Sequence, residues 1–230
     1  MQIYSNTKLL TIIVFFIFIV YTLYELYLIL INKSDNQLKN EAKQTLLYIV
    51  SIATIAYSFI AYKFGTGKGE NFETRSVRYL DWIITTPLIT YSYYLVGRLN
   101  NVQVNFVNLL VTNLLFIGLG VVSEYLYQNK IKYKNLEIYF AILSFIFFGI
   151  FIYNIYVLTS KLKEKQVNTM GLEYFFYIGW TLYGVVFLGE LLGYFKRDFV
   201  INSYAILDVI NKVVYSYIAN IVIDNSSFTI

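Results

Sequence analysis

Two pairs of ionisable residues lie in or directly beside strongly apolar stretches of this sequence. Asp208 and Lys212 are four residues apart in the last stretch, and Arg78 and Asp81 are three residues apart in the third. Ionisable groups are costly in such segments and are functional candidates by default. In a helix, residues three or four apart share a face, so each pair can partly offset its own charge. One lysine between two aspartates leaves a net negative charge that Arg78 would balance. The set either carries proton or ion chemistry or only holds helices together.

Other residue types that commonly do chemistry are missing. The 230 residues include no cysteine and no histidine, which excludes disulfides, thiolate or histidine metal sites, and histidine catalysis. The net charge of +4 is small and scattered, without the basic face that nucleic acid requires. We therefore expect no metal site, no nucleic-acid partner and no enzymatic activity.

The composition indicates a membrane protein made of helices. Hydrophobic residues make up 58% of the chain and charged residues only 14%, against about 25% charged in soluble domains. Backbone groups in a bilayer need internal partners, so spans are helices or closed barrels, and long unbroken apolar runs favour helices. Seven such runs are long enough to cross a hydrocarbon core of about 30 Å. They cover residues 9–31, 45–64, 79–96, 105–127, 136–158, 172–194 and 199–223.

Short polar connections join these seven segments, and no loop is long enough for a second domain. The sequence therefore predicts an all-α membrane protein, with residues 1–230 forming one seven-transmembrane-helix domain.

Three segments resemble the helices of microbial (type 1) rhodopsins. Residues 78–88, Arg-Tyr-Leu-Asp-Trp-Ile-Ile-Thr-Thr-Pro-Leu, resemble the third-helix signature of that family. Residues 207–213, Leu-Asp-Val-Ile-Asn-Lys-Val, resemble the seventh-helix signature. Residues 180–187 resemble the aromatic run of the sixth helix, with Gly184 where proline is usual and Phe187 where tryptophan is common.

The resemblance implies a role for each of the charged residues. Lys212 would bind all-trans-retinal through a protonated Schiff base, with Asp81 and Asp208 as counterions. Asp81 would also be the primary proton acceptor, with Thr85 as its hydrogen-bond partner. Arg78 would be the switchable cation towards the extracellular side. The resemblance also implies a retinal pocket formed by Trp82, Thr86, Ile89, Asn113, Phe116, Gly120, Phe140, Leu143, Trp180, Tyr183 and Phe187.

One position departs from the pattern of a fast proton pump. Eleven residues after Asp81, about 16 Å along a helix, a pump needs a second carboxylate to return a proton, but Ser92 stands there. The Asp-Thr-Ser motif and the compact chain resemble the viral rhodopsins of large DNA viruses. Glu25 is the most deeply placed alternative relay, and Glu124 and Glu190 near segment ends are others.

Three functions remain open for such a protein. The favoured one is a light-driven outward proton pump with Asp81 as acceptor. The alternatives are a light-gated cation channel and a slow-cycling sensory rhodopsin. The expected partners are retinal, the lipid bilayer and protons or small cations, and a homo-oligomer is also possible.

The orientation in the membrane has two opposing indications. Lys and Arg are more numerous on the side of the N-terminus, which by the positive-inside rule favours that side as cytoplasmic. The family resemblance instead implies a multi-pass protein with its N-terminus outside and its C-terminus in the cytoplasm.

Overall fold

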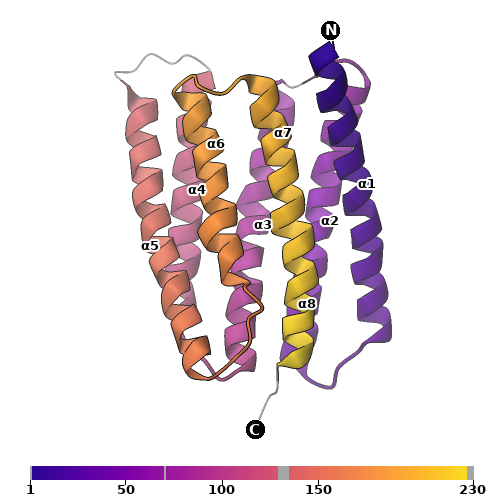
Figure 1. The fold of residues 1–230 in the computed structure, drawn as a ribbon, viewed down its shortest axis with the longest axis vertical. Coiled ribbons are helices and arrows are strands. Elements are labelled where there is room, and N and C mark those ends of the chain that lie inside the picture. Colours follow the sequence, from indigo (N-terminus) through magenta and orange to yellow (C-terminus); the bar gives the residue numbers. More distant parts are fainter. Residues whose placement is uncertain (1, 70, 129–134, 227–230) are drawn as a thin grey trace.

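A computed structural model describes residues 2–69, 71–128 and 135–226 of the chain. In this part the chain forms seven helical rods that lie side by side (Figure 1). The first five rods are α1 (Gln2–Ile31), α2 (Gln37–Gly65), α3 (Phe72–Leu99), α4 (Phe106–Gln128) and α5 (Leu136–Glu164). The sixth joins η1 (Phe175–Trp180) to α6 (Thr181–Leu191), and the seventh joins α7 (Arg197–Asp208), η2 (Val209–Val214) and α8 (Tyr215–Asn225).

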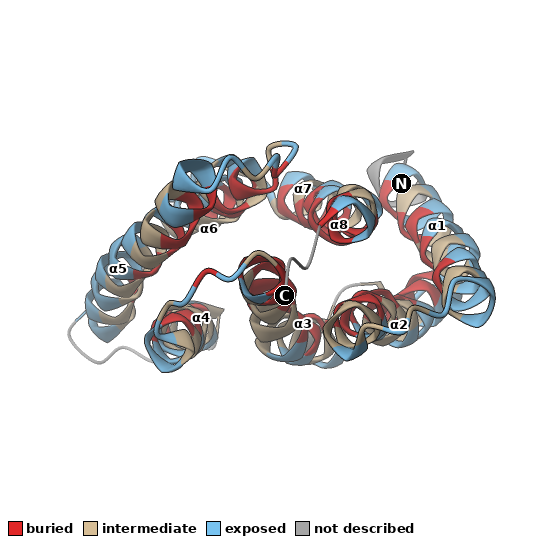
Figure 2. Ribbon diagram, turned by 90° about the horizontal axis from the view of Figure 1, so that it is seen from below, coloured by how far each residue is buried: buried red, intermediate tan, exposed pale blue. Residues whose placement is uncertain are grey.

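The rods form two rows that enclose the core. Viewed along the helices, α2, α3 and α4 make one row, and α1, α7–α8, α6 and α5 make the other (Figure 2). Buried residues face the space between the rows, while exposed residues face outwards. The outward side chains are largely apolar, as in Val20 and Ile55, which are 67% and 70% exposed. An apolar exterior suits a lipid surrounding, because hydrocarbon makes no demand for polar groups.

Five of the described helical stretches are long and apolar enough to cross a membrane. They are Asn6–Ile31, Gln37–Gly65, Phe106–Gln128, Leu136–Glu164 and Arg197–Asn225. The sixth rod is a shorter apolar helix, Phe175–Leu191. The third rod, α3, is less apolar, because it carries Arg78, Asp81 and several hydroxyl side chains.

Three helices, α1, α2 and α3, begin well before the apolar segments that predict them. The segment 45–64 lies within α2, which starts at Gln37 because the Asn36 side chain accepts hydrogen bonds from the Leu38 and Lys39 amides at 2.9 and 3.2 Å. The segment 79–96 likewise lies within α3, which is capped by Asn71. Residues 37–43, expected in a loop, are therefore helical. Apolar runs mark the hydrocarbon core, whereas polar caps decide where a helix ends.

The sixth and seventh rods each contain a stretch of π-helix, and these two stretches, η1 and η2, contact each other. Gly179 of η1 faces Asn211 of η2, and a Cβ on Gly179 would lie 2.2 Å from the Asn211 Oδ1 atom. The next residues along, Trp180 and Lys212, both face the core. π-helical turns are often found at functional sites, and here the pair brings two site residues together.

Candidate functional site

Lys212 lies at the centre of the bundle between two carboxylates. Its amine forms an ion pair with Asp81 of α3, and its Nζ atom is 3.3 Å from Oδ1 of Asp208. The three residues are at most 2% exposed. Charges buried this deeply require partners. Asp81 is 131 positions away from Lys212 in the chain, whereas Asp208 is one helical turn away.

Asp208 is held by three further donors. The Tyr57 hydroxyl donates to Oδ2 at 2.8 Å, and the Tyr183 hydroxyl and the Trp82 indole Nε1–H donate to Oδ1 at 2.7 and 2.9 Å. These donors come from α2, α6 and α3. Hydrogen bonds to an ionised oxygen are stronger than neutral ones, so this set stabilises the negative charge of Asp208.

Asp81 has a much less complete set of partners. Its Oδ1 atom is buried and receives no hydrogen bond from the described residues. The Thr85 hydroxyl, predicted as the hydrogen-bond partner of Asp81, donates to the Asp81 backbone carbonyl at 2.7 Å. A threonine in a helix can satisfy its hydroxyl on the carbonyl one turn earlier in this way. The Asp81 carboxylate therefore depends mainly on Lys212.

Arg78 lies one helical turn before Asp81 and is 2% exposed. Its guanidinium carbon is 5.8 Å from the centre of the Tyr204 ring, within the range of a cation–π contact. Arg78 thus lies between the two carboxylates and the end of the bundle where α3 begins, which is also the end that holds the N-terminus (Figure 1).

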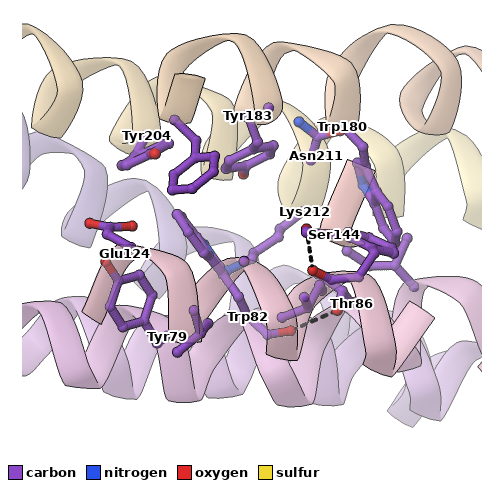
Figure 3. Close-up of a pocket in the computed structure, with 17 residues that line it drawn as sticks. Tyr79, Trp82, Thr86, Glu124, Ser144, Trp180, Tyr183, Tyr204, Asn211 and Lys212 are labelled. Atoms are coloured by element: carbon purple, nitrogen blue, oxygen red, sulfur yellow. Dashed lines mark hydrogen bonds between the residues drawn. The ribbon is translucent and has the colours of Figure 1, made fainter. Parts of the chain in front are cut away.

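A cavity extends from Lys212 between the two rows of helices (Figure 3). Its lining is overwhelmingly apolar and aromatic, and both tryptophans of the chain, Trp82 and Trp180, contribute to it. A Cβ on Gly120 would lie 3.2 Å from Ser144 Oγ, so a side chain there would narrow the cavity. An apolar cavity with aromatic walls that ends at a lysine amine fits a long apolar aldehyde such as retinal.

Eight of the eleven predicted pocket residues line this cavity: Trp82, Thr86, Ile89, Phe116, Gly120, Trp180, Tyr183 and Phe187. The cavity also contacts residues that were not predicted to belong to the pocket: Tyr79, Ile117, Val121, Glu124, Ser144, Gly184, Tyr204 and Asn211. Helical spacing could have indicated some of them, because Tyr204 is one turn before Asp208. Tyr57 offered no such signal among the 24 tyrosines of the chain.

The other three predicted pocket residues lie outside the cavity lining. Leu143 is 43% exposed, because its neighbour Ser144 faces the cavity and a helix turns about 100° per residue. Phe140 is half-buried and lies one turn before Ser144. Asn113 is buried behind Thr86, whose hydroxyl donates to its Oδ1 atom at 3.3 Å.

The remaining predicted residues lie towards the two ends of the bundle. Ser92 is fully buried, and its hydroxyl is 2.7 Å from the Tyr215 hydroxyl. Glu25 is fully buried on α1. At the opposite end, Arg197 forms ion pairs with Glu190 and, at 3.7 Å, with Glu124.

Comparisons with known proteins agree with this arrangement. The chain matches the family described as bacteriorhodopsin-like protein over residues 6–225. It is 30% identical over 183 residues to sensory rhodopsin-2 of Haloarcula vallismortis, which covers 76% of this chain and 74% of that protein. Its fold is similar to the crystal structure of Exiguobacterium sibiricum rhodopsin, with a TM-score of 0.82, 20% identity and 98% of each chain covered.

A viral rhodopsin crystal structure is also similar, with a TM-score of 0.70 and 22% identity over 94% of this chain and 97% of that chain. The predicted seven-helix fold is confirmed.

Proposed function

The chain belongs to the bacteriorhodopsin-like family of microbial rhodopsins, and on this premise we propose that it is a light-driven outward proton pump. Members of this family are retinal-binding integral membrane proteins. We assign the attachment of all-trans-retinal to Lys212, through a protonated Schiff base. When bound, retinal would supply light absorption and a light-induced change of shape. The residues that would hold it are the cavity-lining set, with Trp82 and Trp180 as its largest members.

The difference between the two carboxylates at Lys212 supports the pump. Asp208 accepts hydrogen bonds from Tyr57, Trp82 and Tyr183 besides its ion pair. Asp81 pairs with the Lys212 amine, and its other carboxylate oxygen receives no hydrogen bond from the described residues. Asp208 is therefore the carboxylate that keeps its charge, and Asp81 is the one that can take a proton from the Lys212 nitrogen.

The position of Arg78 supports the direction of transport. A proton received by Asp81 can leave towards the end of the bundle where α3 begins, and Arg78, one turn nearer that end on α3, lies on that route. A positive charge there would favour the anionic form of Asp81 and therefore the release of the proton. With the N-terminus outside, as the family resemblance implies, this route leads outwards.

The pump is tested by photocurrent measurements on voltage-clamped membranes. We expect outward current at zero driving force and no reversal potential. A current that reverses with the cation gradient would instead assign a channel. Asp81→Asn should red-shift the absorption and abolish transport, and Lys212→Ala should give a colourless protein. Unchanged transport in Asp81→Asn would contradict its role as acceptor.

A sensory function is the second candidate, because the curated relatives include proteins named sensory rhodopsins. In that case the photocurrent would be absent although the purified protein is coloured. We also propose that the chain belongs to the viral group with an Asp-Thr-Ser motif, which the structural similarity to a viral rhodopsin supports.

A further inference from the structure

The proton that leaves the Lys212 nitrogen must be replaced, and the third helix offers no acid for this step. The Ser92 hydroxyl is hydrogen-bonded to the Tyr215 hydroxyl and to the Ile89 carbonyl. A serine hydroxyl is too weak an acid to donate a proton at neutral pH. Any replacement has to come from another helix, on the side of Lys212 that faces away from Arg78.

A stripe of buried polar groups runs from Lys212 in that direction. Ser216 and Asn220 are four residues apart and share one face of α8, and Ser216 is four residues beyond Lys212 of η2. All three are buried: Lys212 is 1% exposed, Ser216 0% and Asn220 5%. The Ser216 hydroxyl and the Asn220 Oδ1 atom have no hydrogen-bond partner among the described residues. Buried polar atoms normally have partners, often ordered water, so this face is suited to hold water.

Glu25 lies at the far end of this stripe. It is fully buried on α1, and Asn220 Nδ2 donates to its Oε1 atom at 2.7 Å. Its Oε2 atom receives no hydrogen bond from the described residues, and none of them forms an ion pair with it. An unpaired carboxylate is very costly to bury, so Glu25 is suited to hold a proton.

A second cavity lies at the end of the bundle where α1 ends and α2 begins. It is lined by Ile29, Asn32, Lys33, Asn40, Lys43 and Gln44. Ile29 is one helical turn beyond Glu25 on α1, and Lys43 lies opposite it on α2 in the lining of this cavity. Lys43 itself is 4% exposed and pairs with Asp224 at 2.6 Å, and the Asp224 side chain is 55% exposed. The other titratable group at Glu25 is Tyr21 on the same helix.

We propose that Glu25 is the proton donor that replaces the missing third-helix carboxylate. The Glu25 carboxyl gives its proton along Asn220 and Ser216, with intervening water, to the Lys212 nitrogen and becomes a carboxylate. It then regains a proton from solution through the Lys43 cavity. This inference rests on the proposed function, and it assigns the return path to α1, α2 and α8.

Glu173 provides a matched control. It is also a buried carboxyl, 3% exposed, in the connection between α5 and η1, but both of its oxygens have partners. The Thr169 hydroxyl donates to Oε2 at 2.6 Å, and Lys163 lies 3.3 Å from Oε1. Its partners leave it no free oxygen to face a water path.

The first test measures the return of the proton to the Lys212 nitrogen after a laser flash, by visible absorption of the purified protein with retinal. Glu25→Gln should slow this step about 100-fold, the scale of a lost general acid. The slowed rate should fall about tenfold per pH unit as pH rises, because the protons then come directly from solution. Glu173→Gln should leave the rate unchanged. A normal rate in Glu25→Gln, or equal slowing in both variants, would overturn the proposal.

The second test is made in the dark and is independent of transport. Infrared spectra of the unilluminated protein should contain a protonated carboxyl band at neutral pH that Glu25→Gln removes and Glu173→Gln retains. Asn220→Leu should shift this band, because the Asn220 amide donates to Glu25. A spectrum unchanged by Glu25→Gln would contradict the proposal.

The two proposals can fail separately. If there is no photocurrent but Glu25→Gln still slows the return of the proton, the pump proposal is wrong and the assignment of Glu25 as donor stands. If there is photocurrent but Glu25→Gln does not slow the return of the proton, the pump proposal stands and the assignment of Glu25 as donor is wrong. If Glu25→Gln alters the absorption in the dark, Glu25→Asp is measured in its place. Because aspartate keeps a carboxyl group, this variant should return the proton at a rate close to that of the unmodified chain.

Discussion

At the scale of single residues, the site depends on how unevenly its two carboxylates are satisfied. Asp208 has donors from three other helices, and Asp81 relies on Lys212. Two residues of the same type therefore receive different roles from their surroundings. The hydroxyl of Tyr57, which no sequence motif indicates, is part of that difference.

Tyr57→Phe tests this contribution directly. The change removes one hydrogen bond to a charged oxygen and should lower stability by about 1.5–3 kcal/mol. The thermal unfolding of the coloured protein, followed by absorption, measures the loss. Tyr62→Phe is the control, since Tyr62 is on the same helix and 64% exposed. Equal stability of the two variants would show that the Tyr57 bond contributes little.

At the scale of elements, the contact between η1 and η2 positions Trp180 and Lys212. This contact requires a residue without a side chain at Gly179, because Asn211 occupies the space where a Cβ would lie. π-helical turns are frequent at functional sites, and here both of them lie at the contact between the two rods.

Gly179→Ala should therefore cost about 1–3 kcal/mol, the range for overpacking a core, and should alter the absorption maximum. Gly118→Ala is the control, since a Cβ there would meet nothing within 4 Å. The half-life of the coloured protein at elevated temperature provides the comparison. Comparable half-lives for the two variants would show that the close approach of Gly179 and Asn211 does not require glycine.

At the scale of the whole molecule, the rods place Arg78 and Glu25 on opposite sides of Lys212. The direction of any proton movement is then set by how the bundle lies in the membrane. The surplus of Lys and Arg on the N-terminal side and the family resemblance predict opposite orientations.

Single cysteines can decide the orientation, because the chain has none of its own. Lys68 is exposed just after the end of α2, and Lys165 is exposed just after the end of α5. The ends of these two helices lie at opposite ends of the bundle (Figure 1). With the N-terminus outside, a membrane-impermeant thiol reagent added to intact cells should label Lys68→Cys and spare Lys165→Cys. Both should react after the cells are opened. The reverse pattern in intact cells would make the proposed transport inward.

The sequence by itself determined the number of helices and the types of residue that matter. Apolar runs report directly on the bilayer core, and the residues 78–88 and 207–213 carry their chemistry in local spacing. The exact helix starts were less predictable, because capping by Asn36 depends on side-chain geometry.

Only the tertiary structure decided which distant residues meet. It gave Asp208 its donors, turned Leu143 outwards, paired Thr85 with a backbone carbonyl and joined Glu25 to Asn220 across 195 positions of sequence. Local spacing fixes the face of one helix on which a residue lies. The partner of that face depends on how all seven rods pack together, which no single segment of the chain encodes.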